Sequence, residues 1–221
     1  LLLLIGILPA TFLAITALYN STSAIHNIKA DNLSAIASLK SNAIENYLNQ
    51  ATQQLRSLSH QSALKQSFNA FSESFGLVAK QDTSQLSDFY HSKFATTYKE
   101  KSTQSINVDA IYEQLSESAR DLQTVYISNN HHPVGAKHLL QSNKDGLPYD
   151  LAHQKYHPDL ARFVTDFGYY DLFLVDAASG NVIYSVYKEV DFATNLINGP
   201  YKDSGLAHAF EQARKSADNS V

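Results

Sequence analysis

The chain has 221 residues, 44% hydrophobic and 17% charged, which is ordinary for a folded protein with a membrane segment. Its net charge of −4, with acidic and basic residues interspersed, provides no basic stripe for phosphate backbones, so nucleic acid is not expected as a partner. The absence of Cys excludes disulfides, thiolate zinc sites and cysteine nucleophiles.

A transmembrane helix is predicted for residues 1–25, which begin "LLLLIGILPATFLAITALY" and contain no Asp, Glu, Lys, Arg or His. The apolar run approaches the roughly 20 residues that cross a bilayer. A secretory signal peptide cleaved near Ala14 or Ala17 is the alternative. We favour the uncleaved span because the helical pattern continues past it. The uncleaved span predicts a membrane location with the rest of the chain outside the cytoplasm.

A long stalk helix is predicted for residues 26–80. From His26 to Phe75 the chain has no Pro or Gly, and apolar residues recur at steps of three and four. The last five of them have heptad spacing, which predicts a homodimer through the stalk; a core helix with one buried face is the alternative. The recurring residues are Leu33, Ile36, Ile44, Leu48, Ala51, Leu55 and Leu58.

A helical segment is predicted for residues 81–121, after Gly76 interrupts the stalk pattern. Asp82 or Ser84 is expected to cap its first helix, and Val108 to Arg120 form another. The stretch "LQTVYIS" then changes to β-branched and aromatic residues, which predicts a strand from Leu122 to Ser128.

A sheet-containing module is predicted for residues 122–221. "SNKDGLPYDLAHQKYHP" is expected to be an ordered loop, followed by a helix from Pro158 to Phe167 that Gly168 ends. "DLFLVD" and "VIYSVYK" form a hairpin around "AASGN". Both strands are apolar on both faces, so each face must be covered. The chain begins without Met and ends in "KSADNSV", so we expect a fragment whose missing C-terminal strands complete the sheet.

Three stretches resemble the extracytoplasmic sensor region of bacterial methyl-accepting chemotaxis receptors of the Cache type. They are "NLSAIASLKSNAIENYLNQATQQLRSLS", "DGLPYDLAHQKYHPDLARFVTDFGYYDLFLVDAASGNVIYSVYKE" and "DFATNLINGPYKDSGLAHAFEQAR". The resemblance implies an α+β fold: a transmembrane helix and stalk leading into a PAS-like antiparallel sheet module with flanking helices, here incomplete at its C-terminus.

The resemblance also implies a function. The chain would bind a small-molecule signal and transmit it across the membrane, without being an enzyme. The sensor region of a histidine kinase or a nucleotide cyclase is the alternative. The amino-acid-binding subset of such sensors uses a motif that includes Trp, and this chain has no Trp. Amino acids are therefore not implied as the ligand.

Tyrosines and aspartates on or beside the predicted strands are the candidate ligand-binding residues. Tyr combines ring area with a directed hydroxyl hydrogen bond, as a mostly apolar pocket requires. The alternative is that most of these side chains belong to the core or the sheet edge. Asp176 lies beside the same strands, but it is also a typical capping residue for the hairpin loop. The candidates are Tyr126, Tyr156, Tyr170, Asp171, Tyr184, Tyr187 and Asp191.

Histidines also cluster in the second half of the chain, and "HQKYH" has the i, i+4 spacing that places two imidazoles on one helix face for a metal. Pro158 disfavours helical geometry at His157, so we expect no metal site. A pH-responsive cluster and exposed loop histidines remain alternatives, as does an anchored metal-dependent enzyme. No phosphate loop, Ser elbow or HExxH is present, and no cofactor is expected.

Overall fold

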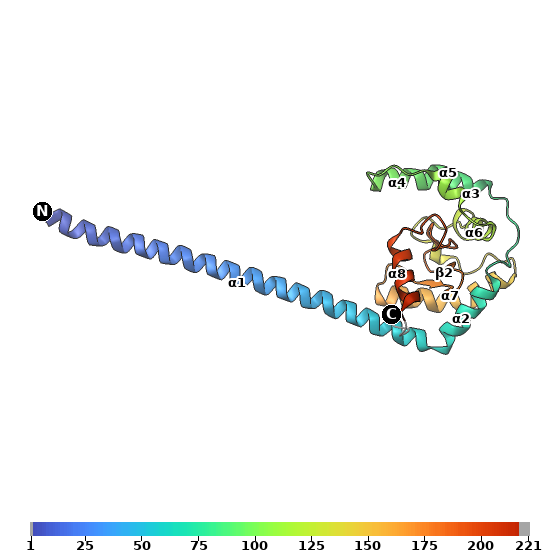
Figure 1. The fold of residues 1–221 in the computed structure, drawn as a ribbon, viewed down its shortest axis with the longest axis horizontal. Helices are drawn as coiled ribbons and strands as arrows, with labels where there is room; N and C mark the ends of the chain where they lie inside the picture. The colour runs from blue at the N-terminus through green and yellow to red at the C-terminus, as the bar shows by residue number, and fades with distance from the viewer. Residues whose placement is uncertain (1, 217–221) are drawn as a thin grey trace. The chain divides into compact units, whose positions relative to one another are not determined.

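The computed structural model describes residues 2–216 of the chain. It consists of two compact units, Leu1–Ser57 and Leu58–Val221. Helix α1 (Leu2–His60) is one uninterrupted helix in Figure 1. Its apolar side chains are mostly exposed: 61% of Ile44 and 57% of Leu48 face solvent. The expected stalk of residues 26–80 is divided at Gln61, which has an extended backbone, and Leu58 packs in the core of the second unit.

The predicted membrane span is wrong: among the residues that the structure describes, no helix is long and apolar enough to cross a bilayer. The sequence suggests why. Thr11 and Thr16 interrupt the apolar run, and the polar stretch from Asn20 to Ser23 ends it. Residue 1 lies outside the described residues.

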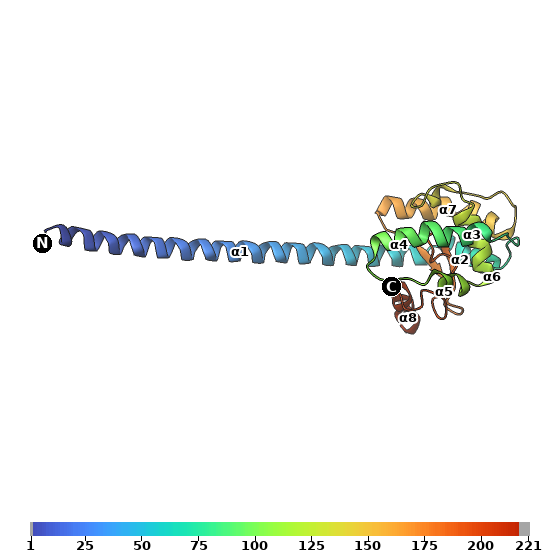
Figure 2. The same ribbon diagram turned by 90° about the horizontal axis from the view of Figure 1, so that it is seen from above.

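The second unit is mostly helical. Ser116 and Ser204 cap two of its helices, each accepting a hydrogen bond from the backbone N–H three residues on. Helices α3 and α4 continue through the π-helical turn η1, and Figure 2 shows them in line. The elements are α2 (Ser62–Ser74), α3 (Ser84–Phe89), η1 (Tyr90–Phe94), α4 (Ala95–Lys101), α5 (Val108–Glu113), α6 (Glu117–Gln123), η2 (Thr124–Ser128), η3 (Lys137–Leu139), α7 (Pro148–Phe167), β1 (Phe173–Val175), β2 (Val182–Ser185) and α8 (Gly205–Lys215).

The predicted PAS-like sheet module is also wrong, because the sheet of the described residues has two strands. Strands β1 and β2 pair antiparallel, with Leu174 opposite Tyr184. Segment 193–196 pairs with residues 180–182 through backbone hydrogen bonds, including an isolated bridge between Asn181 and Asn195. The hairpin itself is confirmed, and both its faces are covered. One belongs to the main core, and the other packs with Ala207 and Phe210 of α8.

The predicted strand from Leu122 to Ser128 is helical instead. It forms the end of α6 and the π-helical turn η2. Thr124 and Ser128 donate their hydroxyls to carbonyls one turn earlier, which satisfies them within a helix. Residues 121–127 are all buried, so no polar face marks a helical period. A short apolar run buried on every side has the same pattern in a strand and in a helix.

Most of the loop predicted before Pro158 is helical as well, from Pro148 onward. Helix α7 starts with Pro148 at its first turn and runs through Pro158 to Phe167, where Gly168 ends it in a left-handed conformation. Tyr149, His153, Leu160 and Val164 share its buried face. The free energy gained by burying this face exceeds the cost of the backbone hydrogen bond that Pro158 cannot make.

Aromatic rings form the centre of the main core. Helix α2 packs along α7 and contacts β2, and Figure 1 shows α2 and α7 along one side of the second unit. Phe71 of α2 stacks on Tyr184 of β2, with ring centroids 4.5 Å apart, and contacts Tyr149 of α7 at 5.3 Å. These contacts join the two helices and the hairpin into one packed body.

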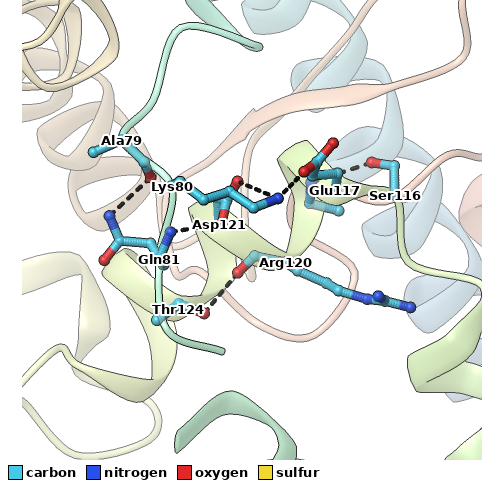
Figure 3. A network of polar contacts seen from close by, with 9 residues as sticks. Ala79, Lys80, Gln81, Ser116, Glu117, Arg120, Asp121 and Thr124 are labelled. Carbon is cyan, nitrogen blue, oxygen red and sulfur yellow. Dashed lines mark hydrogen bonds and ion pairs between the residues drawn. The ribbon is translucent and has the colours of Figure 1, made fainter. Parts of the chain in front are cut away.

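A polar network attaches the connection between α2 and α3 to helix α6 (Figure 3). The buried Asp121 accepts a hydrogen bond from the Gln81 backbone N–H at 2.9 Å. The Lys80 ammonium lies 3.9 Å from the same carboxylate and also pairs with the exposed Glu117. Asp121 therefore fixes the start of the long helix that follows, α3 to α4.

Candidate functional site

A cavity of about 230 Å³ lies between the helix α3–η1–α4, the loop before η3 and the segment that follows β2. We call it the lysine cavity. Its apolar wall is formed by Phe89, Phe94, Ile127, Val134 and Val190. The other lining residues are Lys93, Thr97, Lys101, Gly135, Lys137, Tyr170, Tyr187, Lys188 and Glu189.

Positive charge dominates this lining. Lys93, Lys101, Lys137 and Lys188 contribute to it, against one acidic residue, Glu189, among the described lining residues. None of the four lysines forms an ion pair with a carboxylate in the part of the chain that the structure describes. Glu189 instead accepts a 2.6 Å hydrogen bond from the Tyr170 hydroxyl.

Lys137 is the buried cation of the cavity wall. Its ammonium donates to the Asn130 carbonyl at 2.6 Å, and the Asn130 side chain donates back to the Lys137 carbonyl at 2.9 Å. Burial lowers the pKa of Lys137, and the nearby Lys93 ammonium lowers it further. Lys93 and Lys137 therefore line the same cavity and interact unfavourably.

Unusual backbone accompanies the cavity. Both π-helical turns contribute to it, η1 through Lys93 and Phe94 and η2 through Ile127. Lys188 has a left-handed backbone with φ of 55°, a conformation that is strained for a residue with a side chain. Such features gather at functional sites.

The Lys188 ammonium lies in an aromatic cage behind the cavity. Its Nζ is 4.1 Å from the ring centre of Tyr184, 5.1 Å from Phe192 and 5.8 Å from Tyr126, and it donates to the Ser185 carbonyl. Burial lowers the pKa of Lys188 to about 7, while the Asp171 carboxylate acts in the opposite direction. The rings stabilise the protonated form through their π faces.

Two aspartates border this cage. One oxygen of Asp171 accepts from the backbone N–H groups of Leu172, Val186 and Tyr187, and the other is buried without a hydrogen-bond partner. Burial raises the pKa of Asp171. Burial also raises the pKa of Asp191, to about 7, and the carboxylates of Asp171 and Glu189 add to the effect.

The histidines of "HQKYH" stack in the core, with ring centroids 4.2 Å apart. His157 bonds the Tyr184 hydroxyl through Nδ1 and the His138 carbonyl through Nε2, both at 2.6 Å. Because a carbonyl only accepts, Nε2 carries the proton and Nδ1 accepts from Tyr184. Burial and the Lys188 charge lower the pKa of His157 to about 3 and that of His153 well below its usual value. No group of three metal-ligating side chains exists among the described residues.

The predicted ligand-binding residues are divided by the structure. Tyr170 and Tyr187 line the lysine cavity. Tyr126 and Tyr184 are buried in the core, and the half-buried Tyr156 packs against that core. Asp171 accepts hydrogen bonds from the hairpin backbone, the half-buried Asp191 lies near Tyr201, and Asp176 caps the hairpin loop through Ala178 and Ser179.

The four lysines were not among the predicted site residues. Lys93 and Lys101 lie on helical turns far along the chain from Lys137 and Lys188, and no spacing pattern connects them. Lys188 is the last residue of the predicted strand "VIYSVYK", a position that usually indicates a solvated strand end. Comparison of the chain with models of known protein families, with curated proteins and with solved structures gives no match.

Proposed function

We propose that the chain is the small-molecule sensor region of a receptor, without enzymatic activity, and that its ligand binds in the lysine cavity. The observation that carries this proposal is the cavity itself. It combines an apolar wall with convergent polar groups, the arrangement expected of a ligand site. The two π-helical turns and the strained Lys188 backbone beside it support the same assignment.

A chemotaxis receptor is the receptor class we propose. Its support is the resemblance of residues 145–189 to chemotaxis sensor regions, and a histidine kinase or nucleotide cyclase output is the alternative. The location in the inner membrane, with the sensor in the periplasm, stays a prediction. The metal-dependent enzyme receives no support, because His157 is held through both ring nitrogens and no group of three metal-ligating side chains lies among the described residues.

The cavity walls suggest how binding changes conformation. Most of their residues come from three separate parts of the second unit: the helix 84–101, the loop 134–137 and the segment 187–190. A ligand that contacts all three favours the conformation in which they are close. It changes the output only through unequal affinity for two conformations.

The receptor unit is a homodimer through α1 in this proposal. Ile44, Leu48, Ala51 and Leu55 keep heptad spacing on this helix, and Leu58 does not extend the seam because it is buried in the second unit. Light scattering of the purified 221-residue chain should give a dimer mass. Leu48→Asp should give a monomer, whereas Asn46→Asp, on the opposite helix face, should leave the dimer intact. A monomeric wild-type chain would refute the pairing.

A ligand screen tests the sensor function itself. The full chain is heated with a panel of small metabolites that covers anions, cations and neutral compounds. A compound that binds the folded state raises the melting temperature in a concentration-dependent way. We expect at least one such compound, with saturable heat in calorimetry. A panel that gives neither result would contradict the sensor function.

A further inference from the structure

We infer that the ligand of the lysine cavity is a small organic carboxylate that carries no amino group. This inference rests on the proposed sensor function and specifies its ligand class. It is carried by the charges, the size and the apolar wall of the cavity.

The charge of the cavity calls for an anion. Lys93, Lys101 and Lys137 line it, and none has a carboxylate partner among the described residues. Both Lys93 and Lys137 line this cavity, and the Lys93 charge acts unfavourably on the Lys137 ammonium. A bound carboxylate would relieve this repulsion and form charge-assisted hydrogen bonds with the ammonium groups.

The apolar wall and the volume define the rest of the ligand. The volume of about 230 Å³ is below the roughly 300–1,000 Å³ of sites that hold drug-sized ligands, which suits a smaller molecule. Phe89, Phe94 and Val134 face such a molecule with hydrocarbon, which favours an alkyl or aryl body. Inorganic phosphate would leave this wall unused, and a phosphate ester requires more donors than a monoanion does.

An amino group on the ligand is disfavoured by the charge of the cavity, because four lysines line it against one acidic residue, Glu189, in the described lining. One carboxylate oxygen of Glu189 also already accepts the Tyr170 hydroxyl. A ligand ammonium would therefore lie among an excess of lysine ammonium groups. This argument separates simple carboxylic acids from α-amino acids of the same carbon skeleton.

A matched set of probes with one carbon skeleton tests the inference by calorimetry on the full chain. The set is 3-methylbutanoate, its amide, 3-methylbutylamine, valine and 3-methylbutyl phosphate. We expect saturable binding of 3-methylbutanoate, with affinity at least tenfold above that of the amide, the phosphate and valine, and no binding of the amine.

Lysine variants locate the contact. Lys93→Gln and Lys101→Gln, both at exposed positions, should weaken 3-methylbutanoate binding three- to tenfold each. Lys99→Gln is the matched control, because it is exposed on the same helix but does not line the cavity. Melting temperatures of all three variants should match the wild type, which separates lost binding from lost folding.

The outcomes distinguish the ligand class from the sensor function. Equal or tighter binding of the amide, amine, valine or phosphate probe, or equal weakening by Lys99→Gln, overturns the carboxylate inference and leaves the sensor proposal standing. Absence of binding by every probe also overturns the inference. The sensor proposal fails only if the broad metabolite panel gives no saturable binding either.

Discussion

Tyr184 and Tyr187 lie on one short segment, Tyr184 in the core and Tyr187 at the lysine cavity. Tyr184 is fully buried, stacks on Phe71 and bonds His157. Tyr187 lines the lysine cavity and packs edge-on against His138, with ring centroids 4.5 Å apart. Lys188 follows with its strained backbone and its caged ammonium, a conformation that costs on the order of 1–3 kcal/mol. This segment therefore links the core to the proposed ligand site.

Removing one hydroxyl from each tyrosine separates stability from binding. Tyr184→Phe leaves His157 Nδ1 without its donor in the core, so we expect a loss of about 1–3 kcal/mol in unfolding free energy. Tyr187→Phe should leave stability unchanged but weaken ligand binding by about 1 kcal/mol, the scale of one hydrogen bond. Urea unfolding and calorimetry measure the two effects. A destabilised Tyr187→Phe protein with unaltered binding would remove Tyr187 from the site.

The pKa of His157 makes stability depend on pH. It lies at about 3 in the folded state and near 6.5 in the unfolded chain, so the unfolded state binds the extra proton between these values. The contribution of His157 is fully present above pH 6.5 and is lost as the pH falls towards 3, with a slope of up to about 1.4 kcal/mol per pH unit. His157→Gln should flatten the pH dependence of urea unfolding in this window.

The pH dependence of stability must be compared between variants, because the Asp191 carboxyl changes stability with pH in the opposite direction to His157. The pKa of Asp191 is raised to about 7, so its contribution is lost as the pH rises through 7. His208→Gln, at an exposed position of α8, is the matched control and should keep the wild-type slope. Equal slopes for His157→Gln and wild type would show that His157 does not titrate as a buried group.

At the scale of elements, the sequence predicted those whose ends are marked by turn-forming or helix-ending residues. The hairpin was predictable because Gly180, with φ of 78°, and the Asp176 cap form its loop. Gly168 likewise marked the end of α7. The segment 122–128 was not predictable, because its burial on all sides removes the helical period. Pro158 suggested a helix start, but the buried face of α7 determines the helix on both sides of it.

The site was less predictable than the elements, because its residues come from distant parts of the chain. The sequence places the candidate ligand residues on or beside the strands, and Tyr170 and Tyr187, which lie just outside β1 and β2, do line the cavity. The lysines come from helical turns and a loop that only the packing of the second unit brings together. Tertiary packing, which no local pattern encodes, therefore determines most of the cavity.

The attachment of the α2–α3 connection to α6 depends on one buried carboxylate. Asp121→Ala leaves the Gln81 backbone N–H without its acceptor, and we expect a loss of about 1–3 kcal/mol in unfolding free energy. Glu117→Ala removes the exposed partner of the same Lys80 and should cost less than about 1 kcal/mol. Urea unfolding of both variants measures the difference. Similar losses in the two would mean that Asp121 does not fix the connection (Figure 3).

At the scale of the whole molecule, the chain joins a long helix to a helical unit that contains the lysine cavity. The central claim is that a small molecule binds in this cavity. Thr97 of α4 lines it from an exposed position, so Thr97→Trp should fill part of the cavity without entering the core. Thr96, its exposed neighbour on the same helix, does not line the cavity.

Titration calorimetry of both variants with the tightest-binding compound of the metabolite panel tests this claim most directly. The account predicts that Thr97→Trp abolishes the binding heat or weakens affinity at least tenfold, while Thr96→Trp binds like wild type. Both variants should keep the wild-type melting temperature without ligand. Unchanged binding by a folded Thr97→Trp protein would contradict the claim, because the ligand would then bind outside the lysine cavity.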